Sequence, residues 1–191
     1  FDNLTSSLLF IMGAAYFGSE VSKGLVNVHV KNSTYVSILN YTIIIVGIVA
    51  VYTVVYSPAK ANGLVIEAMT YNQRKQTDPV NALKETKELY ERAISMDTLG
   101  TYEIREFFLQ KSLEYIGLIP QITDEKVKTA VIDFATSSLN QFKIQIEQNP
   151  FDHRARFMLG MYYLNIKNYD LGIQTLKEAL VLAPNKQIAL T

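Results

Sequence analysis

The strongest constraint in this chain is a charge-free stretch, because no Asp, Glu, Lys or Arg occurs between Lys31 and Lys60. Its central part, residues 35–56, is almost entirely apolar. At a helical rise of 1.5 Å per residue, roughly 20 such residues cover the ~30 Å hydrocarbon core of a bilayer. Many of them are β-branched, which also fits a buried strand, but strands rarely exceed about 8 residues. The stretch therefore predicts a membrane-spanning helix.

A second apolar segment, residues 4–18, precedes this stretch. It is short for a full crossing, so it is either a span supported by its flanks or a helix lying in the membrane interface. We favour the span, which makes residues 1–60 a membrane helical hairpin. Because the chain begins at Phe1 rather than Met, and residues 3–19 carry no charge, we also expect it to be a piece of a longer protein. The loop charges do not decide the orientation.

The charges exclude some classes of function. Lys plus Arg and Asp plus Glu are both 18, so there is no basic surplus for binding nucleic acid. There is no Cys, and the two histidines, His29 and His153, lie far apart. The sequence contains no glycine-rich phosphate loop and no hydrolase motif. We therefore expect no cofactor, no metal and no catalytic residue within this chain.

The rest of the chain reads as a series of helices. Ser57-Pro58 is expected to end the membrane helix, with a kink at the proline as the alternative, and a juxtamembrane linker helix is expected over residues 61–76. Asp78-Pro79 is a helix start, a second amphipathic helix runs from Thr101 to just before Pro120, and a third covers residues 125–148. We expect the charged residues Glu103, Arg105 and Glu106 to pair within their own helix; the alternative is contact with the membrane domain or with a partner.

The stretch from Asn149 to Asn185 resembles a tetratricopeptide repeat, a helix–turn–helix of about 34 residues. The best-matching repeat is 152–185, within a repeat domain at 77–191. Arg156 occupies the position that is usually Trp. Phe142 and Pro150 lie 34 residues before Leu176 and Pro184, which suggests a degenerate earlier unit with Lys126 at its glycine position. The residues expected to pack the repeat are Leu159, Gly160, Tyr163, Tyr169, Gly172, Leu176, Ala179 and Pro184.

Three further stretches resemble the C-terminal part of bacterial O-antigen ligases and polymerase-like membrane glycosyltransferases. They are FDNLTSSLLF at the start, YSPAKANGLVIEAM after the long apolar run, and GTYEIRE from Gly100 to Glu106. The resemblance implies a parent protein that transfers a lipid-linked glycan, through an external loop that is not in this chain. No residue here matches a catalytic position. The resemblance also implies an integral protein of the bacterial cytoplasmic membrane, with the repeats on the extracytoplasmic side.

The sequence therefore predicts an all-α chain, with two N-terminal transmembrane helices followed by a tetratricopeptide-like array of α-hairpins. The array would bind a protein or peptide, or a glycan or lipid headgroup, through the first helix of the best repeat. The alternatives are a membrane-anchored repeat scaffold without glycosyltransferase activity, and a soluble helical protein with a buried apolar helix. Phe157 and Leu164 could instead be buried by a neighbouring repeat. The candidate partner-binding residues are Arg154, Phe157, Met161, Leu164 and Asn165.

Overall fold

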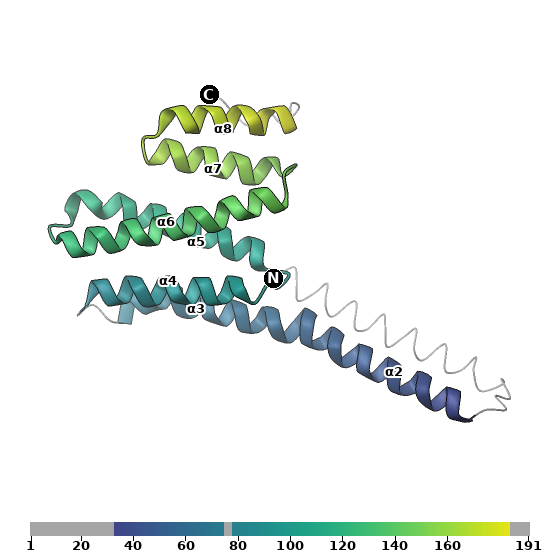
Figure 1. Cartoon of the computed structure of the whole chain (residues 1–191). Coiled ribbons are helices and arrows are strands. Elements are labelled where there is room, and N and C mark those ends of the chain that lie inside the picture. Colours follow the sequence, from purple (N-terminus) through teal and green to yellow (C-terminus); the bar gives the residue numbers. More distant parts are fainter. Residues whose placement is uncertain (1–32, 75–77, 184–191) are drawn as a thin grey trace. The chain divides into compact units, whose positions relative to one another are not determined.

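A computed structural model of the chain describes residues 33–74 and 78–183. These residues are mostly helical and contain no β-strand, so the expected all-α class is confirmed for them. The chain divides into two compact units, Phe1–Ala59 (unit 1) and Lys60–Thr191 (unit 2). Figure 1 shows the helices, which are α2 (Ser33–Val51), a π-helical turn (Tyr52–Tyr56), α3 (Ser57–Arg74), α4 (Pro79–Ser95), α5 (Thr101–Leu118), a 3₁₀ turn (Ile119–Gln121), α6 (Glu125–Gln148), α7 (His153–Asn165) and α8 (Tyr169–Leu182).

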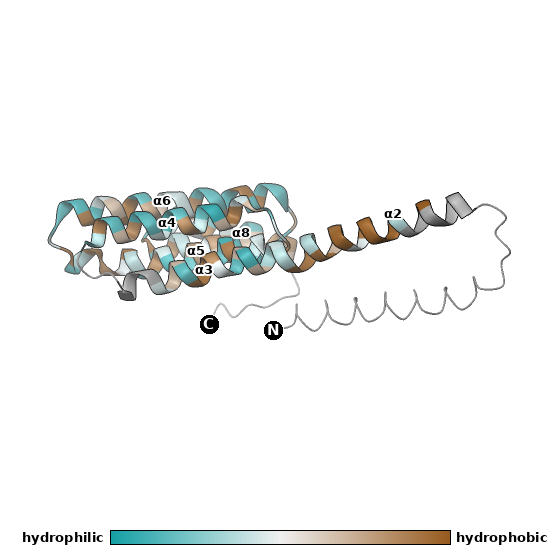
Figure 2. Cartoon of the chain, turned by 90° about the horizontal axis from the view of Figure 1, so that it is seen from below, coloured by the Kyte–Doolittle hydropathy of each residue, from teal (hydrophilic) through white to brown (hydrophobic). Residues whose placement is uncertain are grey.

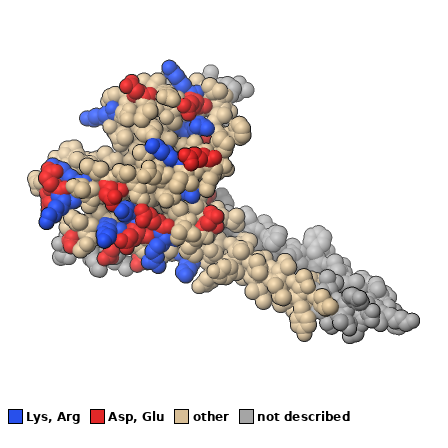
Figure 3. Space-filling view, viewed as in Figure 1, with Lys and Arg blue, Asp and Glu red and all other residues tan. Residues whose placement is uncertain are grey.

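One helix in the described part of the chain is long and apolar enough to cross a membrane. It covers the 30 residues Tyr41–Thr70, with a mean hydropathy of 2.0 in its most apolar window. Figure 2 shows the brown, apolar residues of α2, and on the face drawn in Figure 3 the described part of α2 carries no charge. Two spans were expected, and the described residues supply a single candidate. The other predicted span, residues 4–18, lies outside them.

The expectation that Ser57-Pro58 ends the membrane helix is wrong, because the helix continues through Pro58 to Arg74. Proline has no N–H to donate, and its ring collides with the carbonyl four residues earlier in an α-helix. The turn just before it is π-helical, and the Ser57 N–H donates to the Tyr52 carbonyl, five residues back. This wider turn accommodates the proline, as π-bulges do inside longer helices.

Two threonines of the apolar helix have hydrogen-bond partners within the helix. The Thr42 hydroxyl donates to the Ile38 carbonyl at 2.9 Å, and the Thr53 hydroxyl donates to the Val49 carbonyl at 2.9 Å. Such bonds satisfy the donors of these two hydroxyls in a hydrocarbon environment. The rings of Tyr52 and Tyr56 stack at 5.5 Å near the end of the apolar run, where amphipathic rings favour a membrane interface.

Short polar side chains cap the starts of α4, α6, α7 and α8, whereas α5 begins after Gly100 without such a cap. The Asp78 carboxylate accepts from the Asn81 N–H at 3.1 Å and so starts α4, as predicted. The Asp124 carboxylate accepts from the Lys126 N–H at the start of α6, and Asp152 accepts from two N–H groups at the start of α7. The predicted third helix, residues 125–148, has the same bounds as α6.

An aromatic cluster forms the first core of unit 2. Tyr90 of α4 stacks on Phe108 of α5 at 4.8 Å, and Phe134 of α6 meets the Phe108 ring edge-on at 4.9 Å. All three rings are at most 1% exposed. Of the residues expected to form a linker helix, 61–76, those that the structure describes, 61–74, belong to α3, which buries small side chains against this cluster. The buried residues of α3 are Ala61, Val65 and Ala68.

A second core joins α5, α6 and α7, through Leu109, Phe142 and Tyr162 among others. Figure 1 shows the helices of unit 2 stacked in antiparallel succession. The predicted 34-residue spacing does not extend to the earlier hairpin. Lys126, the expected counterpart of Gly160, lies in the first turn of α6, and α6 has 24 residues where α8 has 14. The hairpin of α5 and α6 is therefore longer than the hairpin of α7 and α8.

Candidate functional site

Two glycines allow α7 and α8 to pack closely, and each faces a leucine of the opposite helix. A Cβ atom built on Gly160 would lie 2.7 Å from Leu176 Cγ and 3.2 Å from the Leu176 backbone nitrogen. A Cβ atom built on Gly172 would lie 2.6 Å from Leu164 Cδ2 and 3.2 Å from the Leu164 backbone nitrogen. The contacts are reciprocal along the hairpin. At this helix separation, neither position has room for a larger residue.

The other residues expected to pack the repeat have different environments. Leu159, Tyr163 and Ala179 are each 7% exposed. Tyr169, at the start of α8, is 58% exposed. Pro184 lies outside the described residues. Most of the predicted packing set thus lies inside the hairpin, and Tyr169 lies on its surface.

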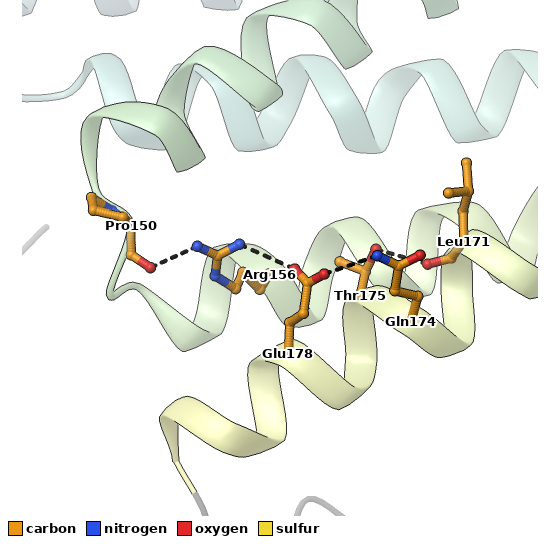
Figure 4. A network of polar contacts seen from close by, with 6 residues as sticks. All are labelled: Pro150, Arg156, Leu171, Gln174, Thr175 and Glu178. Atoms are coloured by element: carbon orange, nitrogen blue, oxygen red, sulfur yellow. Dashed lines mark hydrogen bonds and ion pairs between the residues drawn. The ribbon is translucent and has the colours of Figure 1, made fainter.

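Arg156, at the position where a tryptophan was expected, connects the turn before α7 to α8 (Figure 4). Its guanidinium donates to the Pro150 carbonyl at 2.8 Å and pairs with Glu178 at 3.3 Å. The Gln174 amide donates to the other oxygen of Glu178 at 3.2 Å. The long arginine side chain therefore replaces the packing of an aromatic ring with polar links between the turn and the second helix.

The candidate partner-binding residues do not form one exposed surface. Met161 is 40% exposed, and the exposed Asn165 donates from Nδ2 to the Met161 carbonyl at 2.8 Å. Phe157 is half-buried. Leu164 covers Gly172 within the hairpin. The side chain of Arg154 is 65% exposed, and its head pairs with Glu106 of α5.

A buried polar cluster connects α5 to the end of α6 and the start of α7. Glu106 is 6% exposed and accepts from Arg154 Nη2 at 2.8 Å through Oε2. Its Oε1 has no hydrogen-bond partner among the described residues. Arg105, which is 8% exposed, donates from Nη1 to Gln148 Oε1 at 2.8 Å. The expectation that these two charges pair within their helix is therefore wrong.

The surroundings of this cluster shift its titration. Burial raises the pKa of the Glu106 carboxyl, and the nearby Arg154 guanidinium only partly opposes this shift. For Asp152, burial acts in the same direction, but the neighbouring Tyr102 hydroxyl and the backbone N–H groups of Ala155 and Arg154 lower its pKa overall. Burial, reinforced by Asp152, raises the pKa of the Tyr102 phenol. Glu106 is the carboxylate that folding makes easier to protonate.

We expect two substitutions in this cluster to have opposite effects at neutral pH. A raised pKa means that the folded chain binds the Glu106 proton more tightly than the unfolded chain. Ionised Glu106 therefore destabilises the fold increasingly as pH rises above the ordinary carboxyl range. Glu106→Gln should raise the free energy of unfolding at neutral pH by about 1 kcal/mol, and Arg154→Ala should lower it by about 1–3 kcal/mol by leaving the carboxylate unpaired.

Both differences from the native chain should shrink on acidification, when Glu106 takes up a proton. The measurement is urea unfolding in detergent micelles, followed by circular dichroism at neutral and mildly acidic pH. The contribution of Asp152 is shared by all three chains and cancels in the comparison. If Glu106→Gln destabilised the chain as much as Arg154→Ala at neutral pH, the ion pair would be a net stabilising contact and the prediction would be wrong.

The structure offers little for catalysis. No group of three or more His, Cys, Asp or Glu residues in the described ranges is placed to hold a metal ion. A shallow hollow of about 420 Å³ runs along α8. It is lined by Asp170, Ile173, Gln174, Lys177, Glu178 and Val181. Its mixed apolar and charged lining suits contact with another surface better than the enclosure of a small molecule.

The sequence analysis missed the buried polar cluster. Gln145 of α6 is 1% exposed, and its amide atoms have no hydrogen-bond partner in the described part of the chain. A partial signal was present, since Arg105 and Glu106 interrupt the apolar face of their helix.

Comparison with protein-family models, curated proteins and solved structures gives no match. The described residues thus define a class, an all-helical protein with one candidate membrane span in that part of the chain, and no family is assigned.

Proposed function

We propose that this chain is a membrane-anchored interaction or positioning module of the tetratricopeptide type. The observation that carries the proposal is the reciprocal packing of Gly160 on Leu176 and Gly172 on Leu164, on the same chain as an apolar helix long enough to span a bilayer. Helical hairpins of this kind stack into arrays whose surfaces bind partners. An apolar anchor would hold such an array at the membrane.

The exposed surface of α7 and α8 supports a binding role. Met161 and Asn165 are exposed on α7, and the hollow along α8 places Ile173 beside Lys177 and Glu178. A protein or peptide partner would use the apolar side chains together with these charges. A glycan or lipid headgroup would instead engage Arg154 and Asn165.

We further propose that the parent protein is an O-antigen ligase-like enzyme that transfers a lipid-linked glycan, with this module on the extracytoplasmic side. The support is the resemblance of three stretches, among them Gly100 to Glu106. The structure adds one relevant fact, since Arg105 and Glu106 of that stretch are buried contacts of the helical array. The second candidate is a membrane-anchored scaffold without glycosyltransferase activity, which the same hairpin and apolar helix support equally.

A topology experiment separates the two candidates. Because the chain has no Cys, Lys143→Cys gives a single exposed thiol on α6 for labelling with a membrane-impermeant maleimide. Labelling in intact cells or spheroplasts would put the array on the extracytoplasmic side, as the ligase proposal requires. Labelling only after lysis would contradict that proposal and favour the scaffold.

A charge in the apolar helix should prevent membrane insertion. Ile45→Arg places a guanidinium in the centre of the apolar run, at a cost of about 2.5–3.5 kcal/mol for insertion. We expect the variant to be extracted from membranes by alkaline carbonate, whereas the native chain remains in the pellet.

Ile66→Arg is the matched control. Ile66 lies on α3 within unit 2 and is 62% exposed, against 61% for Ile45. An arginine there should leave carbonate resistance unchanged. Equal extraction of both variants would contradict a span centred on α2, whereas extraction of neither would indicate that the predicted span at residues 4–18 also holds the chain in the membrane.

A further inference from the structure

We propose that one end of unit 2 docks on the bilayer, with the side chains of Leu99, Phe151 and Val181 inserted into the membrane interface. This inference rests on the proposed membrane anchoring and adds a second contact with lipid. This apolar edge contacts the membrane surface directly, and no separate partner protein covers it.

These three side chains are the most exposed large apolar residues in the described part of unit 2. Phe151 is 84% exposed, Val181 79% and Leu99 74%. Single exposed apolar residues are ordinary on protein surfaces. Three such highly exposed apolar side chains at one end of unit 2 need a common explanation, because each of them is left in contact with water.

All three lie at the same end of unit 2. Leu99 is in the turn between α4 and α5, Phe151 is in the turn between α6 and α7, and Val181 is in the last turn of α8. Figure 1 shows both turns and the C-terminal end of α8 on one side of the stack, and the other two turns on the opposite side. At that opposite side, Ile119 and Ile122 pack against the core.

An ion pair just beyond these two turns shows that the turns are neighbours. Glu106 of α5 follows Leu99 by seven residues, and Arg154 of α7 follows Phe151 by three. Arg154 Nη2 donates to Glu106 Oε2 at 2.8 Å. The two apolar residues therefore belong to one edge of the array.

This edge is the one nearest to the membrane span along the chain. A Cβ atom built on Gly100 would lie 3.8 Å from Asn62 Oδ1, so the turn that carries Leu99 touches the start of unit 2. Asn62 follows Tyr56, the end of the apolar run, by six helical residues, which is about 9 Å at 1.5 Å each. The headgroup region is roughly 5–8 Å thick on each side of the hydrocarbon core, so the segment between the apolar run and Asn62 is about as long as that region is thick.

Insertion of these side chains would favour a docked edge substantially. Burying one large apolar side chain shifts an equilibrium by roughly tenfold or more. The double variant Leu99→Ser, Phe151→Ser should therefore lower the ratio of molecules with this edge on the membrane to molecules with it in water by on the order of a hundredfold. Leu118→Ser is the matched control, because Leu118 is 48% exposed at the end of α5, on the opposite side of the stack.

The experiment reads the position of a single fluorophore in the full chain, reconstituted in phosphatidylethanolamine–phosphatidylglycerol vesicles. An NBD label on Asn149→Cys reports on the proposed edge, and one on Gln121→Cys reports on the opposite end. A label on Val46→Cys reports on the span. Lipids with a spin label on the acyl chain quench from within the membrane, and iodide quenches from water.

We expect the label at position 149 to be quenched by the spin-labelled lipid and shielded from iodide, and the label at position 121 to behave in the opposite way. The double serine variant should abolish lipid quenching at position 149, and Leu118→Ser should leave it unchanged. Circular dichroism checks that each variant is folded.

Two results would overturn the inference. One is equal iodide quenching at positions 149 and 121; the other is shielding at 149 without lipid quenching, which would indicate a protein contact instead. The label at position 46 separates this failure from a failure of the anchoring proposal. If lipid quenches position 46 but not position 149, anchoring stands and docking fails; if lipid quenches neither, both fail.

Discussion

Phe108→Ala is expected to lower the free energy of unfolding of unit 2 by about 3–5 kcal/mol, the usual cost of truncating a buried phenylalanine. Phe108 is 0% exposed and lies between Tyr90, stacked at 4.8 Å, and Phe134, edge-on at 4.9 Å. The substitution would remove its ring contacts and leave a cavity among α4, α5 and α6. Urea unfolding in micelles, followed by circular dichroism, measures the loss.

The adjacent residue is the control. Phe107 has the same side chain on the same helix but is 45% exposed. Phe107→Ala should cost no more than about 1 kcal/mol, since exposed sites contribute little to stability. Similar losses for the two variants would contradict the assignment of Phe108 to the centre of the core.

Gly160→Ala is expected to destabilise the hairpin of α7 and α8 by about 1–3 kcal/mol, the cost of forcing a methyl group into a packed interface. The new Cβ atom would lie 2.7 Å from Leu176 Cγ, and the Leu176 backbone nitrogen at 3.2 Å limits how far the helices can adjust. Gly172→Ala should act in the same way against Leu164. The measurement is the urea midpoint, or proteolysis of α8 under native conditions.

Gly63→Ala is the matched control for both. Gly63 lies inside α3, and a Cβ atom there would have no neighbour within 4 Å among the atoms that the structure describes. This variant should be more stable than the native chain by about 0.5–1 kcal/mol, because alanine has the higher helix propensity. Stabilisation by Gly160→Ala as well would show that the helices can separate without loss, and would weaken the repeat proposal.

The sequence by itself determined the local features of this protein. The caps at Asp78 and Asp124, the all-helical class and the apolar helix follow from residue spacing, because helix starts and apolar periodicity depend on neighbours within a few positions. The bounds of α6 were predicted correctly for the same reason. The first predicted span and Pro184 lie outside the described residues and stay predictions.

Only the tertiary structure determined which residues of each helix are buried and which distant residues they contact. It separated the buried Phe108 from the exposed Phe107, two adjacent phenylalanines that hydrophobicity alone does not distinguish. It also paired Arg105 and Glu106 with Gln148 and Arg154, more than 40 residues away, where local reasoning expected contacts within one helix.

The two wrong expectations, at Pro58 and in the hairpin of α5 and α6, have the same cause, because sequence patterns report only on residues that are close together in the chain. A proline usually ends a helix, but one π-helical turn accommodates this one and the helix continues. The repeat spacing predicted a 34-residue earlier unit, whereas α6 extends to 24 residues because its apolar face packs on α4, α5 and α7 at once. Residue spacing specifies a helix and its apolar face, but the partner of that face depends on residues far away in the chain.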